Sequence, residues 1–561
     1  MPARLTRRDF VKASTASLGL GLAASRALAG PPAPSERSIA RGPFQPSWES
    51  LTQNYRVPDW FRDAKFGIWA HWSAQCVPEQ GDWYARQMYI QGNPVYEHHV
   101  KTYGHPATFG FMELDHLWRA ERWEPEKLMA LYQRAGAKYF FALANHHDNF
   151  DAYASKHHAW NSVNVGPKRD IVGTWAKAAR ARGLKFGVSN HSAHAWHWFQ
   201  VAYGYDAEGP QRGVRYDAAR LSKADGKGKW WEGLDPQELY TGRNIVVPDG
   251  LTSIKEMKEW HEKNDRIWTE SPPANNPAFT RNWFLRCQDL IDQYQPDVVY
   301  FDNTELPLGQ AGLDIVAHYY NANFARNQGK LDAVVNAKHM LAEHVPALVE
   351  DIERGVATGI RPHPWQTDTC LGQWHYSRAV AEQNGYKTAG QVIRMLLDIV
   401  SKNGSLMLSV PLRGDGTIDE REHAILEELA AWMKTSSEGV FGSRPWTVYG
   451  EGPATLETPE TGEFGGARDV RRKPYTLEDI RFTTKPNALY AYLLAPQPGA
   501  PVVIKSLAKS SPQSKGRKVE DVSLVGGSSL EWRQDERGLS VKLPDRLPSA
   551  EAIGLRIRGV S

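Results

Sequence analysis

The chain has 561 residues, more than one ordinary hydrophobic core holds, so we expect at least two domains. Hydrophobic residues make up 41% and charged residues 23%, the balance of a globular protein, and the net charge of +3 gives no electrostatic reason to expect a nucleic-acid partner. Its three cysteines are far apart in sequence, which excludes a disulfide framework and a paired-cysteine metal site.

The N-terminus carries the pattern of an export signal. Two arginines, Arg7 and Arg8, precede an apolar segment at 13–24 and small residues at 27–29. The apolar segment is too short to span a membrane, and no later segment of the chain is long and apolar enough. We predict that residues 1–29 are a twin-arginine signal peptide, that the mature protein is periplasmic or secreted, and that the Pro-rich residues 30–47 form a flexible leader.

Residues 48–445 alternate apolar runs with helical patterns. The runs are apolar on both faces, which is typical of parallel strands covered by helices. They are 66–72, 138–148, 184–191, 297–303, 333–338 and 405–412. One helix is predicted to end near Tyr294, and another to start at a capping box of Thr388 and Gln391 and to end at a C-cap at Asn403 and Gly404.

Polar residues gather at the C-terminal ends of four of these runs, at His71, His146 to Asp148, His191 and Asp302. Polar side chains at the ends of many parallel strands are typical of a (β/α)8-like (TIM) barrel, whereas a doubly wound sheet would usually show a Gly-rich phosphate loop. We predict an α/β fold with such a barrel as the catalytic domain, and an insertion at about 200–275. Period-two patterns in 446–561 predict a C-terminal antiparallel β-sandwich.

The run PDVVYFDNTE places Asp302 at the end of a buried strand. A carboxylate held rigidly there could be the nucleophile of a retaining glycosidase, which pairs one ionised carboxylate with one protonated carboxyl. Asp302 could equally cap the following turn.

The histidines also have two interpretations. A group that includes His146, His147, His191 and His194 could bind a metal. Neutral imidazoles that hydrogen-bond sugar hydroxyls account for the same residues without one. The 21 Trp and 22 Tyr residues suit sugars too, since such rings combine an apolar face with a polar edge, although most should be core.

The chain resembles α-L-fucosidases of glycoside hydrolase family 29 from about Trp60 to its end. The resemblance is carried by an ordered set of motifs: AKFGIWAHW, GDWYARQMY, NHHDNFDAYASK, KRDIVGTWAKAARARGLKFGV, PDVVYFD and VSKNGSLMLSV with DGTIDE and GVFGSRPWTVYGEGP. It implies a retaining exo-glycosidase with a catalytic barrel and a C-terminal β-sandwich, no cofactor or metal, and a fucosylated oligosaccharide or glycoconjugate as the substrate.

By this resemblance Asp302 matches the nucleophile, and His71, His146, His147 and Trp83 match residues around the sugar. Tyr300 stands where many relatives have Trp. Four further positions depart from the family pattern and are also expected at the substrate: Asp82 in place of Glu, His191 after GLKFGVSN, Lys338 in place of Arg, and Trp365 in PWQTDTC in place of PWET.

The catalytic acid, the protonated carboxyl that gives its proton to the departing oxygen, is predicted to be Glu353. This residue precedes Arg354 and Gly355 on a loop suited to an active site. Glu350 and Glu305 are the alternatives. The carboxyl of the catalytic acid must stay protonated near neutral pH, which requires burial or the nearby charge of Asp302 to raise its pKa.

The main hypothesis is an exported α-L-fucosidase that forms a glycosyl-aspartate intermediate. The alternatives are the same mechanism on a related terminal sugar such as an α-L-galactoside, a metal-dependent barrel hydrolase, and an inactive carbohydrate-binding protein. An apolar pocket discriminates weakly against the extra hydroxyl of L-galactose.

Overall fold

The structure is a computed structural model that describes residues 37–462, 466–514 and 516–560. The predicted signal peptide and residues 30–36 of the predicted leader lie outside these residues. Residues 39–47 of the leader are anchored: Phe44 is buried, and its backbone N–H donates to Asn321 Oδ1 of helix α14 (Gln310–Arg326) at 3.0 Å. Residues 39–47 are therefore not the flexible tether that their composition predicts.

The predicted barrel is confirmed, since eight parallel strands close in the order β1-β2-β3-β4-β5-β6-β8-β9. Their bounds are β1 Phe66–Ala70, β2 Tyr139–Asn145, β3 Lys185–Asn190, β4 Val298–Thr304, β5 Val334–Lys338, β6 Val349–Asp351, β8 Trp365–Cys370 and β9 Gly404–Ser409. The six apolar runs in the sequence correspond to six of these strands.

Strands β6 and β8 are not apparent in the sequence because they are polar. Their sequences are VED and WQTDTC, so neither shows the apolar run expected of a buried strand. A single 3-10 turn at Val345–Ala347 precedes strand β6.

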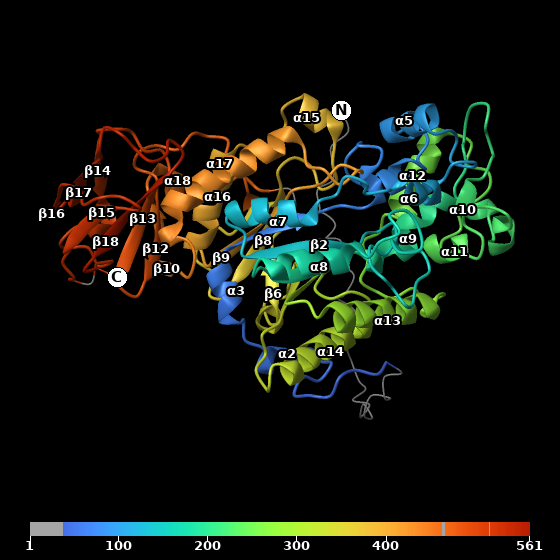
Figure 1. The fold of residues 1–561 in the computed structure, drawn as a ribbon, viewed down its shortest axis with the longest axis horizontal. Coiled ribbons are helices and arrows are strands. Elements are labelled where there is room, and N and C mark those ends of the chain that lie inside the picture. Colours follow the sequence, from blue (N-terminus) through green and yellow to red (C-terminus); the bar gives the residue numbers. More distant parts are fainter. Residues whose placement is uncertain (1–36, 463–465, 515, 561) are drawn as a thin grey trace, which may run out of the picture. The chain divides into compact units, whose positions relative to one another are not determined.

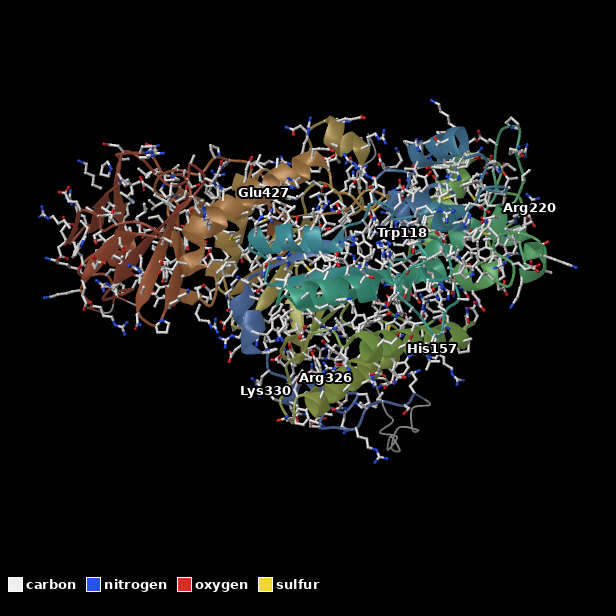
Figure 2. All side chains as sticks on the ribbon, viewed as in Figure 1. Trp118, His157, Arg220, Arg326, Lys330 and Glu427 are labelled. Carbon is white, nitrogen blue, oxygen red and sulfur yellow. The ribbon has the colours of Figure 1, made fainter. Side chains whose placement is uncertain are left out.

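Helices surround the barrel (Figure 1). Those before the insertion are α2 Trp48–Asn54, α3 Asp59–Ala64, α4 Tyr84–Gln87, α5 Pro94–Thr102, α6 Phe111–Leu117, α7 Pro125–Arg134 and α8 Ile171–Ala181. Those after it are α13 Pro277–Tyr294, α14, α15 Arg378–Glu382, α16 Ala389–Ser401 and α17 Glu420–Ser436. Ion pairs join their outer faces, as between Arg134 on α7 and Glu427 on α17. Figure 2 marks Glu427 on the outer side of α17.

The predicted capping box of helix α16 is present at Thr388 and Gln391. At its other end Asn403 takes the left-handed conformation (φ +72°), but Gly404 already begins strand β9. A Cβ atom at Gly404 would lie 2.6 Å from the Trp365 ring, so this glycine is required by packing.

The insertion lies between strand β3 and helix α13. Its helices are α9 Ala195–Trp198, α10 Asp217–Arg220, α11 Pro236–Leu239 and α12 Ile254–Asn264. A small apolar cluster of its own holds it together, formed by Tyr205, Ala207, Val247 and Met257. The insertion is therefore a folded unit on the loop side of the barrel.

The C-terminal region contains two antiparallel sheets around one apolar cluster, which confirms the predicted β-sandwich. The first sheet has the order β10 (Arg444–Glu451), β12 (Ile480–Lys485), β13 (Ala488–Leu493), β18 (Ile553–Arg558) and β15 (Asp521–Leu524). The second has the order β14 (Pro501–Ile504), β17 (Gly538–Lys542) and β16 (Trp532–Asp535), and the short helix α18 spans Pro453–Leu456.

One short strand of the C-terminal region reaches back to the barrel. Strand β11 (Ala467–Arg468) pairs with β7 (Gly355–Val356), which lies between barrel strands β6 and β8. Gly355 and Gly466 allow this close approach, because a Cβ atom at Gly466 would lie 2.6 Å from the Ile352 side chain. The loop before Gly355 is thus held from the C-terminal side.

The barrel strands separate two apolar layers. Trp69, Phe141, Tyr300 and Met407 belong to the cluster inside the barrel. Side chains of the alternate positions pack outward against the helices, as expected for strands with period two. This alternation decides which predicted site residues reach the pocket.

Candidate active site

The C-terminal ends of β4 and β5 bring Asp302 and Lys338 together. Lys338 Nζ lies 2.5 Å from Asp302 Oδ1 and 2.5 Å from Glu353 Oε2, on the loop between β6 and β7. Because both oxygens contact the same nitrogen, they are no more than about 5 Å apart. A retaining glycosidase needs a carboxyl separation of roughly 5–5.5 Å.

Two histidines lie at the other oxygen of Asp302. His147 Nε2 is 3.4 Å and His191 Nδ1 is 3.2 Å from Asp302 Oδ2. The Nδ1–H of His147 donates to the backbone carbonyl of His191 at 2.7 Å, which fixes the orientation of the His147 ring. Its Nε2 therefore faces Asp302.

The two carboxyl groups differ in protonation. Burial would raise the pKa of Asp302, but the Lys338 cation and the two histidines hold it well below its usual range. Burial raises the pKa of Glu353 to about 7, although Lys338 acts in the opposite direction. Near neutral pH the site thus offers one ionised carboxylate beside one carboxyl that can hold a proton.

The remaining histidines form a packed group behind this pair. The rings of His146 and His191 are stacked with centroids 4.9 Å apart, and His71 lies 5.4 Å from His191. Burial lowers the pKa of His71 and His146 well below the usual value and that of His191 to about 4. Neutral imidazoles both donate and accept hydrogen bonds, as hydroxyl recognition requires.

The same side chains come close enough to hold a metal ion. Ligand atoms within 4.8 Å of one another occur in three groups among the described residues: His71, His146 and His191; Asp82, His146 and His375; and His147, His191 and Asp302. The metal-dependent alternative is therefore tested with chelator below.

Asp82 and Trp83 form one wall of the site at the start of α4. Asp82 Oδ1 lies 2.8 Å from His375 Nδ1, and His375 packs 4.8 Å from the His146 ring. Trp83 has a left-handed backbone (φ +63°) and sits edge-to-face against His147 at 6.4 Å. Both predicted residues therefore border the histidine group.

The insertion supplies a second part of this wall. The ring of Trp268 lies 5.3 Å from His147 and 5.5 Å from Trp83. Glu270 fixes the segment, since it accepts hydrogen bonds from Asn303 Nδ2 at 2.5 Å and from the Thr304 backbone N–H at 2.9 Å. The insertion is thus attached to β4 directly after Asp302.

Tyr300 lies inside the barrel below the Lys338 side chain, which is 5.7 Å from the centre of its ring. Its hydroxyl donates to Asp368 Oδ2 at 2.9 Å. It therefore supports the site from within the barrel.

Three residues considered for the site are engaged elsewhere. Trp365 points outward from β8 into the strand–helix layer, and its indole N–H donates to the Lys402 carbonyl at 2.9 Å, so its placement at the substrate was wrong. Glu350, beside inward-facing Asp351, is paired with Arg361. Glu305 is paired with His344 at 2.6 Å on the rim.

Sequence reasoning missed several residues of the site. They are Gln75, Trp268, Glu270, Asn303, Asp351, Asp368, Trp374 and His375. Asp368 had a weak signal, since it lies in PWQTDTC, but the strand that presents it was not recognised. His375 and Trp268 lie in irregular loops, where no periodicity marks a residue as inward-facing.

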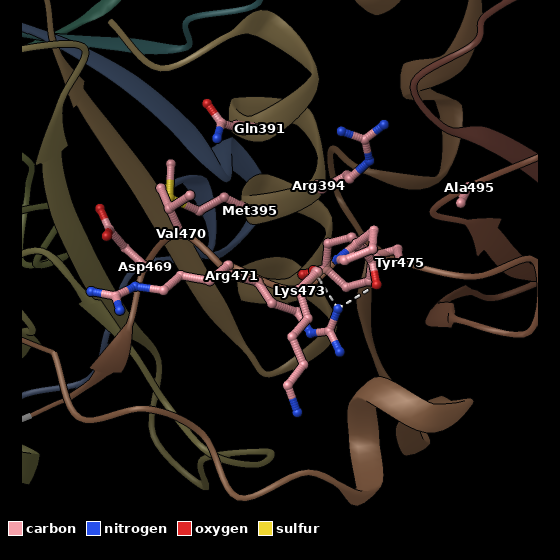
Figure 3. A pocket seen from close by; sticks show the side chains of 11 residues that line it. Gln391, Arg394, Met395, Asp469, Val470, Arg471, Lys473, Tyr475 and Ala495 are labelled. Carbon is pink, nitrogen blue, oxygen red and sulfur yellow. Dashed lines mark hydrogen bonds between the residues drawn. The ribbon is translucent and has the colours of Figure 1, made fainter. Parts of the chain in front are cut away.

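A pocket of about 340 Å3 lies between helix α16 and residues 469–475 (Figure 3). Its basic residues are paired: Arg471 with Glu457 at 2.6 Å, Arg472 with Glu460 and Arg394 with Glu551. None of its lining residues belongs to the cluster around Asp302.

Comparisons with known proteins show which family the chain resembles. Residues 33–438 match the family model described as Alpha-L-fucosidase. The tissue alpha-L-fucosidase of Homo sapiens is 24% identical over 90% of this chain and 89% of its own, and that of Mus musculus is 25% identical over 91% and 94%. Among solved structures, Thermotoga maritima alpha-fucosidase with a mechanism-based inhibitor is 24% identical, with a TM-score of 0.64 over 92% of this chain and 100% of its own. Alpha-L-fucosidase isoenzyme 1 from Paenibacillus thiaminolyticus is 19% identical, with a TM-score of 0.58 over 91% and 99%.

Proposed function

Because the chain belongs to the α-L-fucosidase family and is a glycoside hydrolase, we propose that it releases terminal α-L-fucosyl residues from glycans with retention of configuration. The observation that carries the retaining mechanism is the carboxyl pair bridged by Lys338, with its short separation and its opposite protonation.

In the first step Asp302 attacks the anomeric carbon. Its carboxylate is ionised, and its position at the end of β4 holds it rigidly. Glu353 donates its proton to the departing glycosidic oxygen, so the leaving group departs as a neutral alcohol and a glycosyl ester forms on Asp302. In the second step Glu353, now ionised, takes a proton from water, which attacks the same carbon and releases Asp302.

The neutral histidines supply the polar part of sugar recognition. His71, His146 and His147 offer ring nitrogens to hydroxyl groups, while Trp83 and Trp268 bound the pocket with flat rings. None of these contacts requires a metal ion.

A panel of nitrophenyl glycosides that includes the α-L-fucoside and the α-L-galactoside tests the proposal, assayed with and without chelator. We expect turnover of the fucoside that chelator does not change. Turnover of the galactoside alone would show that the substrate is an α-L-galactoside and not a fucoside. Activity that is lost to chelator and restored by zinc would show a metal-dependent hydrolase in place of the retaining mechanism.

Asp302→Gly tests the nucleophile. Turnover should fall by several powers of ten, in line with losses of about 10⁶ for other catalytic nucleophiles. A 2-fluoro-fucoside should label Asp302 in the native enzyme, and Glu305→Gln is the matched control, because that carboxylate lies on the rim and should be dispensable. Labelling of another residue, or first-formed fucose of inverted configuration, would reject the mechanism.

We also propose export through the twin-arginine signal of residues 1–29. Among the described residues, the structure holds no helix that is both long and apolar enough to cross a membrane.

A further inference from the structure

Two more carboxyl groups lie inside the barrel beneath the site. Asp351 ends β6 and Asp368 belongs to the adjacent β8, and their exposed fractions are 2% and 1%. Each uses one oxygen: Asp351 Oδ1 accepts from Gln366 Nε2 at 2.9 Å, and Asp368 Oδ2 accepts from the Tyr300 hydroxyl at 2.9 Å. The mechanism above assigns a role to neither.

The second oxygen of each carboxyl has no donor. Asp351 Oδ2 and Asp368 Oδ1 are buried, and no described residue donates a hydrogen bond to either. Asp351 is paired in register with Gln366 of β8, and Asp368 lies two residues further along on the same inward face, so the two carboxyl groups are diagonal neighbours. Two adjacent ionised carboxylates are strongly unfavourable in a buried site, whereas one proton between them satisfies both oxygens.

The surrounding strands do not neutralise this pair. Strand β2 contributes Tyr139, whose hydroxyl donates to Gln366 Oε1 at 3.0 Å, and β9 places Met407 beside Asp368. Strand β4 contributes Tyr300 and Asp302, β5 contributes Lys338, and the loop after β6 contributes Glu353. The Lys338 cation attracts both buried carboxyls, but its short contacts are with Asp302 and Glu353.

We propose that Asp351 and Asp368 share a single proton, and that the one negative charge they retain keeps Glu353 protonated as the catalytic acid. The proposal rests on the acid role of Glu353 given above. Both aspartates act through another group and are positioning residues. In support, burial raises the pKa of Asp351 and Asp368, and the charge of Asp368 adds to the effect of burial in raising the pKa of Glu353.

The proton count can be read from three variants: Asp351→Asn, Asp368→Asn and the double variant. In either single variant the new amide N–H replaces the shared proton, the remaining aspartate is ionised, and the net charge of the pair is unchanged. The alkaline limb of kcat/KM should therefore stay within a few tenths of a unit of that of the native enzyme. The double variant removes the charge, so this limb should move to lower pH by about one unit.

Two results would overturn the proposal. If both carboxylates were ionised, each single variant would shift the limb and the double variant would add the two shifts. If the pair were uncharged or without influence on the acid, the double variant would leave the limb in place. Glu422→Gln is the matched control, since this carboxyl is also buried without a donor among the described residues but lies on α17, and it should not move the profile.

Infrared spectra test the shared proton without an activity assay and without the double variant. At about pH 9, where ordinary carboxyls are ionised, the spectrum of either single variant should lack one C=O band of a protonated carboxyl that the native protein shows, while the bands of Asp115 and Glu422, whose pKa burial also raises, should stay. Spectra of the native protein and the variants that show no such difference would refute the shared proton. An enzyme inactive on fucosides that keeps the band would instead reject the proposed function alone.

Discussion

Replacing Lys338 by Met tests the electrostatics of the site most directly. The substitution keeps the length of the side chain and removes the charge that touches both Asp302 and Glu353 at 2.5 Å. Without the cation the ionised form of each carboxyl is less stable, so the pKa of both should rise. The nucleophile must be ionised and the acid protonated, and both limbs of the pH profile should therefore move upward.

The size of the shift follows from the contacts. A hydrogen bond to a charged group contributes about 1.5–3 kcal/mol to stability, and one pKa unit corresponds to about 1.4 kcal/mol. For Glu353, which is largely buried, we expect a rise of about one to two units from its pKa of about 7. The acidic limb should also rise, because Lys338 is the main charge that depresses the pKa of Asp302.

The assay is kcat/KM of an aryl fucoside as a function of pH. Lys338→Arg should restore both limbs, because guanidinium remains charged throughout the range. Lys402→Met is the matched control: Lys402 is equally buried and pairs with Asp398 at 2.6 Å, away from the pocket, so only stability should change. Limbs that stay in place or move to lower pH in Lys338→Met would refute the reasoning.

Three further predictions concern the acid, the export signal and a core residue. Glu353→Ala should slow substrates with poor leaving groups far more than aryl fucosides, and azide should restore turnover of the activated substrate; equal losses on both would assign the acid role elsewhere. Replacing Arg7 and Arg8 by Lys should leave the full-length precursor inside the cell, and mature protein found outside it would contradict the twin-arginine reading. Trp365→Ala should lower the free energy of unfolding by about 3–5 kcal/mol in denaturant titrations while KM stays unchanged, whereas a raised KM would return this residue to the substrate site.

The fold could be predicted where strands are apolar on both faces. The runs that became β1, β2, β3, β4, β5 and β9 are such strands, and they were enough to indicate a barrel. Strands β6 and β8 could not be recognised, because Asp351, Gln366 and Asp368 occupy their inward positions. These polar residues satisfy one another across the sheet, which a pattern of single residues along the chain does not reveal.

The candidate site could be predicted where a side chain follows a strand. Asp302, His147 and Lys338 all come together in the structure. Residues from irregular loops were missed. Trp268 is held in place by the nearby Glu270, which contacts His194 and Asn303. Both partners are far from Glu270 along the chain, so the local sequence does not reveal these contacts. Trp365 was misplaced because strand β8 was not recognised. Neighbouring residues of a strand point to opposite faces, so Trp365 faces outward while Gln366, the next residue, faces into the barrel.

The pairing of β7 with β11 makes the catalytic barrel depend on the C-terminal region. A chain that stopped after residue 445 would keep all eight barrel strands and every side chain that faces the substrate, yet it would lose the strand that holds the loop carrying Glu353. Recombination that exchanged the β-sandwich for another module would face the same loss. A Cβ atom at either Gly355 or Gly466 would crowd this pairing, although more than a hundred residues separate the two glycines.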